Sequence, residues 1–220
     1  MANVLIDGKE IIAKSGANLL WTALDNGFYI PNLCNMRETN NFIASCRMCL
    51  VEIKGRKIPV TACTEKVYDG MVVRLDTDKV KKIRNTSFEL LLSNHDLDCN
   101  KCGKNKNCEL QKVASKLHIK LKLNRLKQIN RKLPVDTSHA LFYYNPNRCI
   151  LCGKCIWTCR ENKVGIIDFA FRGIDTKIST FAAIPFAETL CTSCLACVSV
   201  CPVGALVSNK EQNLNSEIMV

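Results

Sequence analysis

The sequence predicts an α+β protein built from several small domains. Three observations lead to this prediction. At 220 residues the chain is longer than most single domains. Patterns typical of short strands and of helices occur in separate segments along it. Fifteen cysteines are unusually many for this length, while aromatic residues make up only 6%. We therefore expect small cores that are cross-linked at their cysteines.

Residues 1–78 are expected to form a small mixed sheet with one helix. Two short apolar runs are joined by Asp7-Gly8, which is a strong signal for a hairpin turn. Leucines at helical spacing then precede Gly27, a plausible end for a helix. The expected elements, in chain order, are a hairpin over residues 3–13, a helix over 17–27, strands over 49–62 that turn near Gly55, and a strand over 70–76.

Residues 79–119 are expected to form a small helical domain. Its first helix should bury the apolar residues that recur at spacings of three to five, and a second helix is predicted over residues 108–119. The positions expected on the buried face of the first helix are Val80, Ile83, Phe88 and Leu91 or Leu92.

The rest of the chain is expected to contain one further domain. Residues 120–136 are polar and basic and are interpreted as a connector. Residues 137–210 contain two similar cysteine groups that start 42 residues apart, the pattern of an internal duplication. Residues 211–220 are expected to be a loose tail.

The net charge of +11 raises the possibility of nucleic-acid binding. Residues 101–132 account for nearly all of it, with eleven Lys or Arg against the single acid Glu109. This segment lacks interleaved aromatic residues, and thiolate ligands would offset much of the charge. We expect no nucleic-acid partner; the basic run is either a docking face for an acidic partner or a solvated surface.

Bound metal explains the cysteines better than disulfides do. An odd number would leave one thiol unpaired, and spacings of two or three residues would strain the bridges. The first residues do not resemble a signal peptide, so a cytoplasmic location is expected. Residues 189–209 carry no charge, but they contain four cysteines and a proline, so we expect no membrane span.

The last two cysteine groups share the spacing C-x2-C-x2-C-x3-C, and Pro202 follows the second. Two such runs are the signature of a bacterial-type ferredoxin with two 4Fe-4S clusters, in which the fourth cysteine of each run ligates the other cluster. Paired zinc sites are the alternative. The expected ligand sets are Cys149, Cys152, Cys155 and Cys201 for one cluster, and Cys191, Cys194, Cys197 and Cys159 for the other.

The first cysteine group, with the spacing C-x11-C-x2-C-x13-C, comprises Cys34, Cys46, Cys49 and Cys63. Its spacing alone leaves a zinc site possible. The surrounding text, IPNLC, SCRMCLVEI and TACTEKVYDGMVV, resembles the 2Fe-2S domain that begins the large iron-sulfur subunit of respiratory NADH dehydrogenase and its relatives in NAD-linked hydrogenases and formate dehydrogenases. The resemblance implies a β-grasp, plant-type ferredoxin fold with these four cysteines as ligands.

Cys99, Cys102 and Cys108 supply only three thiols, and His95 lies four residues upstream. The segment NHDLDCNKCGKNKNCELQ resembles the same family's segment for a 4Fe-4S cluster held by one histidine and three cysteines. An ordinary surface histidine is the alternative. With His95 included, the chain has sixteen donors, enough for four sets of four.

The resemblance covers roughly residues 1–210 and extends to the N-terminal region of iron-only hydrogenases, which carries the four motifs in the same order. Asp96 and Lys106 stand where the family leads us to expect proline and glycine. Arg160 replaces the proline that follows the other ferredoxin-type run. His118 and His139 are expected to be structural or exposed.

The sequence contains neither G-x-G-x-x-G after a strand nor G-x-x-x-x-G-K-[ST], so no nucleotide or flavin site is recognisable. We therefore expect an electron-transfer subunit with one 2Fe-2S and three 4Fe-4S clusters and no substrate-converting site. The resemblance implies a flavin- and NAD(P)-binding partner subunit, and a second redox enzyme subunit or ferredoxin. Electrons are expected to pass between the Cys34 centre and the paired clusters through the His95 cluster, in either direction. An independent multi-cluster ferredoxin and a zinc-scaffolded interaction module are the alternatives.

Overall fold

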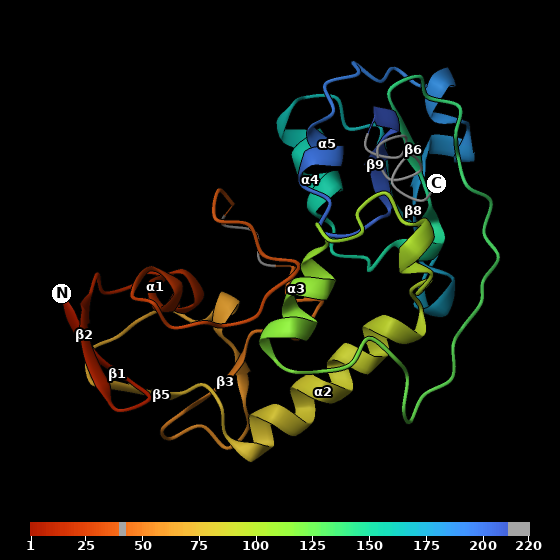
Figure 1. Ribbon diagram of the computed structural model, residues 1–220. Coiled ribbons are helices and arrows are strands. Elements are labelled where there is room, and N and C mark those ends of the chain that lie inside the picture. Colours follow the sequence, from red (N-terminus) through yellow and green to blue (C-terminus); the bar gives the residue numbers. More distant parts are fainter. Residues whose placement is uncertain (40–42, 211–220) are drawn as a thin grey trace. The chain divides into compact units, whose positions relative to one another are not determined.

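The computed structural model describes residues 1–39 and 43–210, and the chain divides into two compact units, Met1–Leu90 and Leu91–Val220. The long helix α2 (Asp78–Ser93) contains the boundary between them (Figure 1). The finer division into four segments and a tail stays a prediction, and the tail itself lies outside the described residues.

The first unit is a five-stranded mixed sheet in the order β2-β1-β5-β3-β4. Strands β1 and β5 are parallel, and the other pairs are antiparallel. With α1 this is the β-grasp arrangement, so the predicted α+β class is confirmed. The elements are β1 (Ala2–Ile6), β2 (Lys9–Ala13), α1 (Leu19–Asp25), β3 (Leu50–Ile53), β4 (Val60–Thr61) and β5 (Met71–Arg74).

The predicted hairpin turn between β1 and β2 is confirmed. Ile6 pairs with Lys9, which leaves a two-residue turn in which Asp7 and Gly8 have φ values of 45° and 82°. Two consecutive left-handed residues match the right-handed twist of the flanking strands, and Asp-Gly adopts them at little cost. The Asp7 carboxylate also accepts a hydrogen bond from the Leu75 N–H at 2.9 Å, which ties the turn to the end of β5.

Helix α1 is defined at both ends by its sequence. The Asn18 side chain accepts a hydrogen bond from the Trp21 N–H at 3.3 Å and so caps the first turn. Gly27, with φ of 81°, stops the helix as predicted. Leu19 and Leu20 are fully buried beneath the sheet-forming residues.

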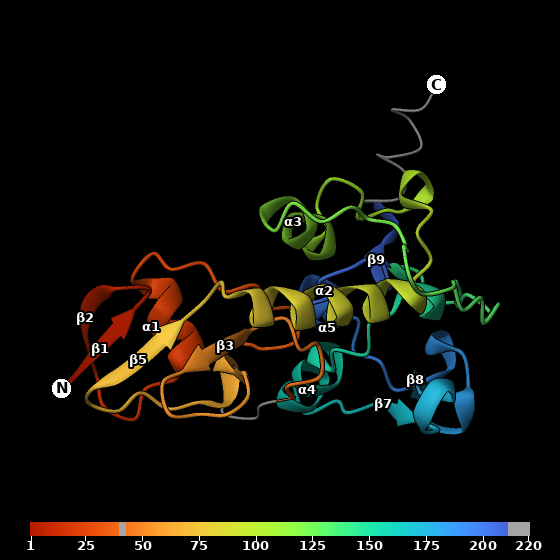
Figure 2. The same ribbon diagram turned by 90° about the horizontal axis from the view of Figure 1, so that it is seen from below.

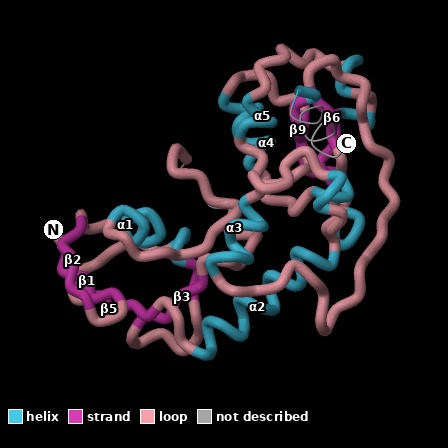
Figure 3. Tube along the Cα trace, in the orientation of Figure 1, coloured by secondary structure: helices cyan, strands magenta, loops and turns pink. Residues whose placement is uncertain are grey.

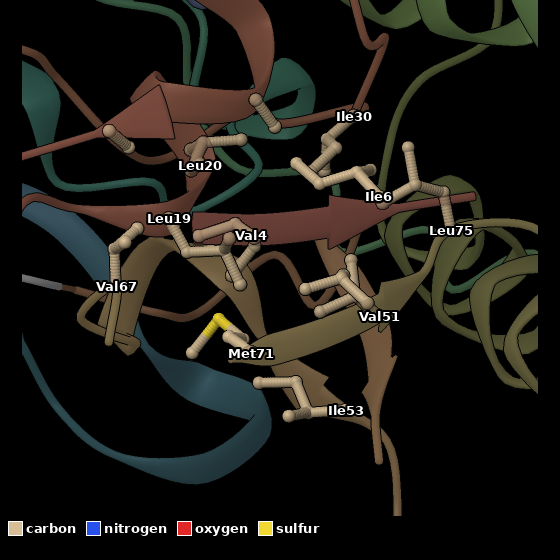
Figure 4. Packing of buried hydrophobic residues seen from close by; sticks show 14 of the residues in the cluster. Val4, Ile6, Leu19, Leu20, Ile30, Val51, Ile53, Val67, Met71 and Leu75 are labelled. Carbon is tan, nitrogen blue, oxygen red and sulfur yellow. The ribbon is translucent and has the colours of Figure 1, made fainter. Parts of the chain in front are cut away.

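One continuous core holds the first unit together. Figure 4 shows side chains from the sheet and from α1 packing on one another, including Val4, Leu20 and Met71. Residues of β1 and β5 alternate between buried and more exposed positions, as expected for strands with one covered face, whereas Leu50, Val51 and Ile53 of β3 are all buried. Cys49 and Cys63 are themselves part of this core.

Helix α2 was predicted correctly, but the prediction that Ile83 lies on its buried face is wrong. Val80, Phe88 and Leu92 are fully buried, whereas Ile83 is 38% exposed. Arg84 is buried in its place at 4% exposure, because its guanidinium finds backbone acceptors in the first unit.

The second unit is built from short elements joined by long loops, as Figure 3 makes plain. The strands form two antiparallel pairs, β6–β9 and β7–β8, and α4 packs against α5. Residues 117–141 contain neither helix nor strand apart from one bridge between Asp136 and Tyr144. The elements are α3 (Glu109–Lys116), β6 (Phe142–Tyr144), α4 (Lys154–Glu161), β7 (Ile167–Ala170), β8 (Lys177–Thr180), α5 (Ala196–Ser199) and β9 (Leu206–Ser208).

Pairing of β6 with β9 brings the chain before the first ferredoxin-type run beside the chain after the second (Figure 1). The β7–β8 hairpin lies between the runs in sequence and is seen most clearly in Figure 2. The two cysteine runs are thereby closed into one small domain. None of the helices in the described ranges combines the length and apolar character that a membrane span requires.

Candidate metal centres

The four cysteines of the first group are all buried in the first unit. Cys34 follows α1, Cys46 and Cys49 precede β3, and Cys63 lies in the 3-10 turn Ala62–Thr64. The sulfur atoms of Cys34 and Cys46 are 3.4 Å apart. Sharing of this hydrogen bond lowers the pKa of the Cys34 thiol and raises that of Cys46.

Cys49 and Cys63 complete the same group. A hydrogen bond with Cys63, burial and the nearby negative charges of Cys63 and Cys34 raise the pKa of Cys49. The Ala62 N–H donates to the Cys49 carbonyl at 2.8 Å, and the Asn18 side chain donates to the Cys63 carbonyl at 2.6 Å. All four predicted thiols of this group therefore lie within electrostatic reach of one another.

Arg84 is a residue at this centre that the sequence analysis missed. Its guanidinium donates to the carbonyls of Met48 at 3.1 Å and of Leu50 at 2.9 Å, on either side of Cys49. It also donates to the Leu75 carbonyl at 3.0 Å. Burial lowers the pKa of Arg84, opposed by the negative charges of Asp76 and Cys49. Arg84 belongs to none of the cysteine motifs. The available signal in the sequence was that this charged residue lies among the apolar positions of a helix.

His95 is buried in the second unit at 5% exposure. Burial and the positive charge of Arg148 lower its pKa to about 4, so the imidazole is neutral at physiological pH. Its Nδ1 atom is buried and has no hydrogen-bond partner among the residues that the structure describes. The Gln128 side chain donates to the His95 carbonyl at 2.8 Å and holds the backbone. The alternative of an ordinary surface histidine is therefore wrong.

Cys99 and Cys102 lie within electrostatic reach of Cys108. Burial raises the pKa of Cys108, and the negative charges of Cys102 and Cys99 raise it further. A Cβ atom added to Gly204 would lie only 2.2 Å from the Cys102 sulfur, so glycine is required there for Cys102 to keep its place. The Cys102 sulfur therefore packs directly against the backbone at Gly204.

The two departures from the family pattern each have a structural account. Lys106 has φ of 66°, a conformation that glycine adopts without cost, and its N–H donates to the Gln111 side chain at 2.9 Å. The Asp96 N–H donates to the Asn147 carbonyl at 2.8 Å, a bond that proline could not make. This loop is therefore anchored by contacts particular to this chain.

The thiols of the two ferredoxin-type runs act on one another electrostatically, and the assignment of ligands to two sets stays a prediction. Burial raises the pKa of Cys155, and the charges of Cys152, Cys149 and Cys201 raise it further. Burial raises the pKa of Cys197 to about 12, together with the charges of Cys159, Cys191 and Cys194. A small cavity between β6 and α5 is lined by the same four thiols of this second set and by apolar side chains such as Phe142 and Leu195.

Both loops have left-handed residues at the same positions, in keeping with the repeated cysteine pattern. The second and fourth residues after the first cysteine are left-handed in each, with φ values of 53° and 72° for Leu151 and Gly153, and of 56° and 57° for Ser193 and Leu195. The Leu151 N–H donates to the Cys149 sulfur at 3.4 Å, and the Ser193 N–H donates to the Cys191 sulfur at 3.4 Å. Hydrogen bonds of this kind favour the thiolate form of a ligand.

His139, which had no expected partner, lies beside the second of these loops. It is buried at 9% exposure and stacks on Phe142 with ring centroids 4.2 Å apart. Its Nδ1 accepts from the Leu141 N–H, and its Nε2 lies 3.2 Å from the Ser193 hydroxyl. The expectation of a structural histidine is met, and its place beside a cysteine loop is new. His118 is exposed.

The donor chemistry fits iron-sulfur clusters. All fifteen cysteines are free thiols, and most of those in the last two groups have raised pKa values caused by burial. Buried thiolates repel one another, so a positively charged core is needed to hold several of them ionised together. Lone pairs on neutral imidazole and on thiolates are the donors that iron-sulfur clusters take.

A β-grasp sheet that presents four thiols, together with duplicated cysteine loops, defines an iron-sulfur protein of the ferredoxin type. Comparison with known families agrees. Residues 1–78 match the 2Fe-2S iron-sulfur cluster binding domain, residues 84–121 the NADH-ubiquinone oxidoreductase-G iron-sulfur binding region, and residues 144–208 the 4Fe-4S dicluster domain.

Among curated relatives, the NADP-reducing hydrogenase subunit HndD of Solidesulfovibrio fructosivorans is 33% identical over 96% of this chain and 36% of its own length. The NADPH-Fe(3+) oxidoreductase subunit alpha of Geobacter sulfurreducens is 36% identical over 94% of this chain and 24% of its own length. The NADH-ubiquinone oxidoreductase 75 kDa subunit of Reclinomonas americana is 34% identical, over 94% of this chain and 29% of its own length. The chain thus spans between a quarter and about a third of these relatives.

A chain of an NAD+-reducing [NiFe]-hydrogenase has the same fold, with a TM-score of 0.86 and 28% identity over 94% of this chain and 87% of that one. The resemblance predicted from the sequence is therefore confirmed. Over nearly its whole length the chain is similar to iron-sulfur proteins that include HndD, the NADPH-Fe(3+) oxidoreductase alpha subunit and the 75 kDa subunit of NADH-ubiquinone oxidoreductase.

Proposed function

We propose that this chain is an electron-transfer subunit of an NAD(P)-linked oxidoreductase complex and holds one 2Fe-2S and three 4Fe-4S clusters. One observation carries the proposal: the charges that raise the pKa values of Cys49, Cys108, Cys155 and Cys197 come mainly from thiols of the same expected ligand set, with Cys197 also acting on Cys155 across two sets. In particular, Cys201 joins the first ferredoxin-type run and Cys159 joins the second.

The ligand assignment follows these groups. The β-grasp unit offers its four thiols to the 2Fe-2S cluster, and His95 replaces a fourth thiolate at one 4Fe-4S cluster. The proposed ligands are Cys34, Cys46, Cys49 and Cys63; His95, Cys99, Cys102 and Cys108; Cys149, Cys152, Cys155 and Cys201; and Cys191, Cys194, Cys197 and Cys159.

The relay role follows from the chemistry of the groups concerned. Hydride donors deliver two electrons at once, whereas iron-sulfur clusters carry one each. A flavin- and NAD(P)-binding subunit is therefore the partner expected on one side, and a second redox enzyme subunit or a ferredoxin on the other. The relatives' names support such partners, because they are subunits of a hydrogenase, an NADPH-Fe(3+) oxidoreductase and an NADH-ubiquinone oxidoreductase. Free buried thiols also favour a reducing, cytoplasmic location.

The decisive experiment is anaerobic reconstitution followed by metal analysis and a redox titration monitored by paramagnetic resonance. One 2Fe-2S and three 4Fe-4S signals are expected, with iron and acid-labile sulfide in matching amounts. Fewer than four centres after full reconstitution would contradict the proposed count. A colourless protein that holds zinc without sulfide would establish the zinc-scaffolded alternative.

His95→Cys tests the histidine ligand. The variant should keep a cluster at this site and lower its reduction potential, because a thiolate adds one negative charge that neutral imidazole lacks. His118→Cys, at an exposed histidine, is the matched control and should leave all potentials unchanged. An unaltered spectrum and potential in His95→Cys would remove His95 from the ligand set.

Isolation of the native protein distinguishes a complex subunit from a diffusing carrier. A stoichiometric assembly with a flavoprotein is the expected result. Recovery of this chain alone, active as an electron acceptor and free of partners, would support the independent multi-cluster ferredoxin.

A further inference from the structure

Arg148 lies between two of the proposed centres in the second unit. It immediately precedes Cys149 in the chain and is buried at 5% exposure. Buried arginine is uncommon unless its five N–H groups find acceptors. At this position the acceptors come from the other centre's loop, between His95 and Cys102.

Three hydrogen bonds join Arg148 to that loop. Its Nε donates to the Asp96 carboxylate at 3.2 Å, its Nη1 to the Lys101 carbonyl at 3.1 Å and its Nη2 to the Asp98 carbonyl at 3.2 Å. The backbone repeats the connection, because the Asp96 N–H donates to the Asn147 carbonyl at 2.8 Å. One side chain thus fixes both ends of the loop that presents the His95 centre.

A second contact brings the same two centres together. The Cys102 sulfur sits so close to Gly204 that a Cβ atom there would be 2.2 Å away, and the Arg148 Cδ atom would be 3.5 Å from that Cβ. Gly204 follows Cys201, a proposed ligand of the neighbouring cluster, by three residues. The Glu109 N–H donates to the Pro202 carbonyl at 2.9 Å. The junction at which Arg148, Gly204 and the Cys102 sulfur meet is here called the wall between the two centres.

Positive charge is concentrated in this wall. Arg148 is buried at 5% exposure against the loop of the His95 centre, and Lys104, at 8% exposure, lies in the same loop within electrostatic reach of Cys201. Asp96 is the carboxylate that pairs with Arg148, and its side chain is 40% exposed, so water screens it. A buried cation between two anionic centres favours the state with more electrons on either of them.

We propose that Arg148 is a positioning residue that joins the His95 centre to the Cys149 centre, and that its charge, with that of Lys104, raises the reduction potentials of both. This inference rests on the proposed function, because it needs clusters at both centres. It assigns a purpose to a residue that no motif contains. It also accounts for Asp96, whose carboxylate and N–H both serve this connection.

The test compares Arg148→Gln and Arg148→Lys in the full reconstituted chain, with the midpoint potential of each centre measured by paramagnetic resonance. Loss of the charge in Arg148→Gln should reduce the equilibrium constant for reduction of the His95 centre about tenfold, or about 59 mV for one electron. Arg148→Lys keeps the charge and should retain most of the potential, although both variants lose the forked hydrogen bonds. Arg172→Gln, at an exposed arginine of the same unit, is the control and should change neither potential.

Each outcome decides the inference. If Arg148→Gln holds all four centres at unchanged potentials, the electrostatic role is wrong and the proposed function stands. If the unaltered chain lacks one of the two centres, the proposed function fails first. If Arg148→Gln cannot hold a cluster, Lys104→Gln decides instead, because it removes charge without breaking the Arg148 hydrogen bonds. A lowered potential of the Cys149 centre in that variant supports the inference, and an unchanged one overturns it.

Discussion

Several loop residues near the thiols are held in a left-handed backbone conformation that their side chains disfavour. Lys106 and Leu195 have φ values of 66° and 57°. A residue with a Cβ atom costs about 1–2 kcal/mol there relative to its right-handed conformation. Such a cost persists only where the surroundings fix the backbone, and both residues lie within cysteine loops.

Lys106→Gly is expected to stabilise the protein by up to about 1 kcal/mol, because glycine adopts the positive φ without strain. The Lys106 side chain is exposed, so little else is lost. The midpoint of guanidinium-induced loss of visible absorbance measures the change. Lys112→Gly, in the interior of α3, should have the opposite effect, by about 1 kcal/mol. Destabilisation by both variants would show that the strain at residue 106 is negligible.

Among individual residues, the candidate cysteine ligands could be predicted from the sequence. The buried polar residues beside them could not. Cysteine ligands are recognisable by their spacing, because a cluster demands three donors from one tight loop. Arg84, Arg148 and His139 stand in no pattern. Each is buried against a polar partner far away in the chain, at separations that reach 36, 52 and 54 residues respectively. Long-range hydrogen bonds of this kind leave no local trace in a sequence.

Among the elements, α2 fixes the cysteine loop of the first unit through a single side chain. Arg84 donates to carbonyls on both sides of Cys49 and to one at the end of β5. Without the guanidinium, those buried carbonyls would have to find other donors or remain unsatisfied. The helix is therefore expected to be part of the 2Fe-2S site as well as its support.

Arg84→Gln should destabilise the protein by about 2 to 4 kcal/mol, because buried acceptors lose their donors. It should also lower the potential of the 2Fe-2S centre selectively, since a buried positive charge near Cys49 is removed. Thermal unfolding and a redox titration provide the two measurements. Lys82→Gln, an exposed cation of the same helix, is the control. Equal effects from the two variants would contradict a specific role for Arg84.

The backbone at Gly204, just before β9, is constrained by the sulfur atom of Cys102. Gly204→Ala would place a methyl carbon 2.2 Å from the Cys102 sulfur, so either the thiol or the backbone has to move. We expect the variant to lose iron from the His95 centre before the others, as measured by metal content and paramagnetic resonance. Gly173→Ala, whose methyl group would meet nothing within 4 Å, should keep all its iron despite a φ of 61°. Full occupancy in Gly204→Ala would show that the loop yields easily.

The existence and order of most elements followed from local patterns. The Asp7-Gly8 hairpin, α1, α3 and the strands of the first unit are where turn residues and periodicity indicated. The error at Ile83 arose because helical spacing cannot tell which of two adjacent positions is buried when a polar residue has buried partners. The pairing of β6 with β9 was also beyond reach, because three-residue strands carry no recognisable pattern.

For the whole molecule, the two units differ in what holds them together. The first has a continuous apolar core drawn from its sheet and α1. The helices α4 and α5 in the second have eight and four residues, and its strands have three or four, lengths that are not stable without tertiary contacts. The second unit should therefore depend more strongly on its clusters.

Removal of iron with a chelator under reducing conditions is expected to unfold the second unit first. Amide hydrogen exchange should show protection kept in β1 and β5 while it is lost from α4, α5 and β9. The unaltered holoprotein, treated in parallel without chelator, is the control. Simultaneous loss of protection in both units would mean that the apolar core of the first is insufficient on its own.

The parallel pairing of β1 with β5 joins the beginning of the first unit to its last strand, with Val4 opposite Met71. During synthesis, Cys34, Cys46, Cys49 and Cys63 all leave the ribosome before β5 does. The sheet cannot close until β5 has emerged, so these thiols spend that interval without their apolar cover. Oxidants have access to them then, and insertion of the cluster has to wait for the strand that is made last.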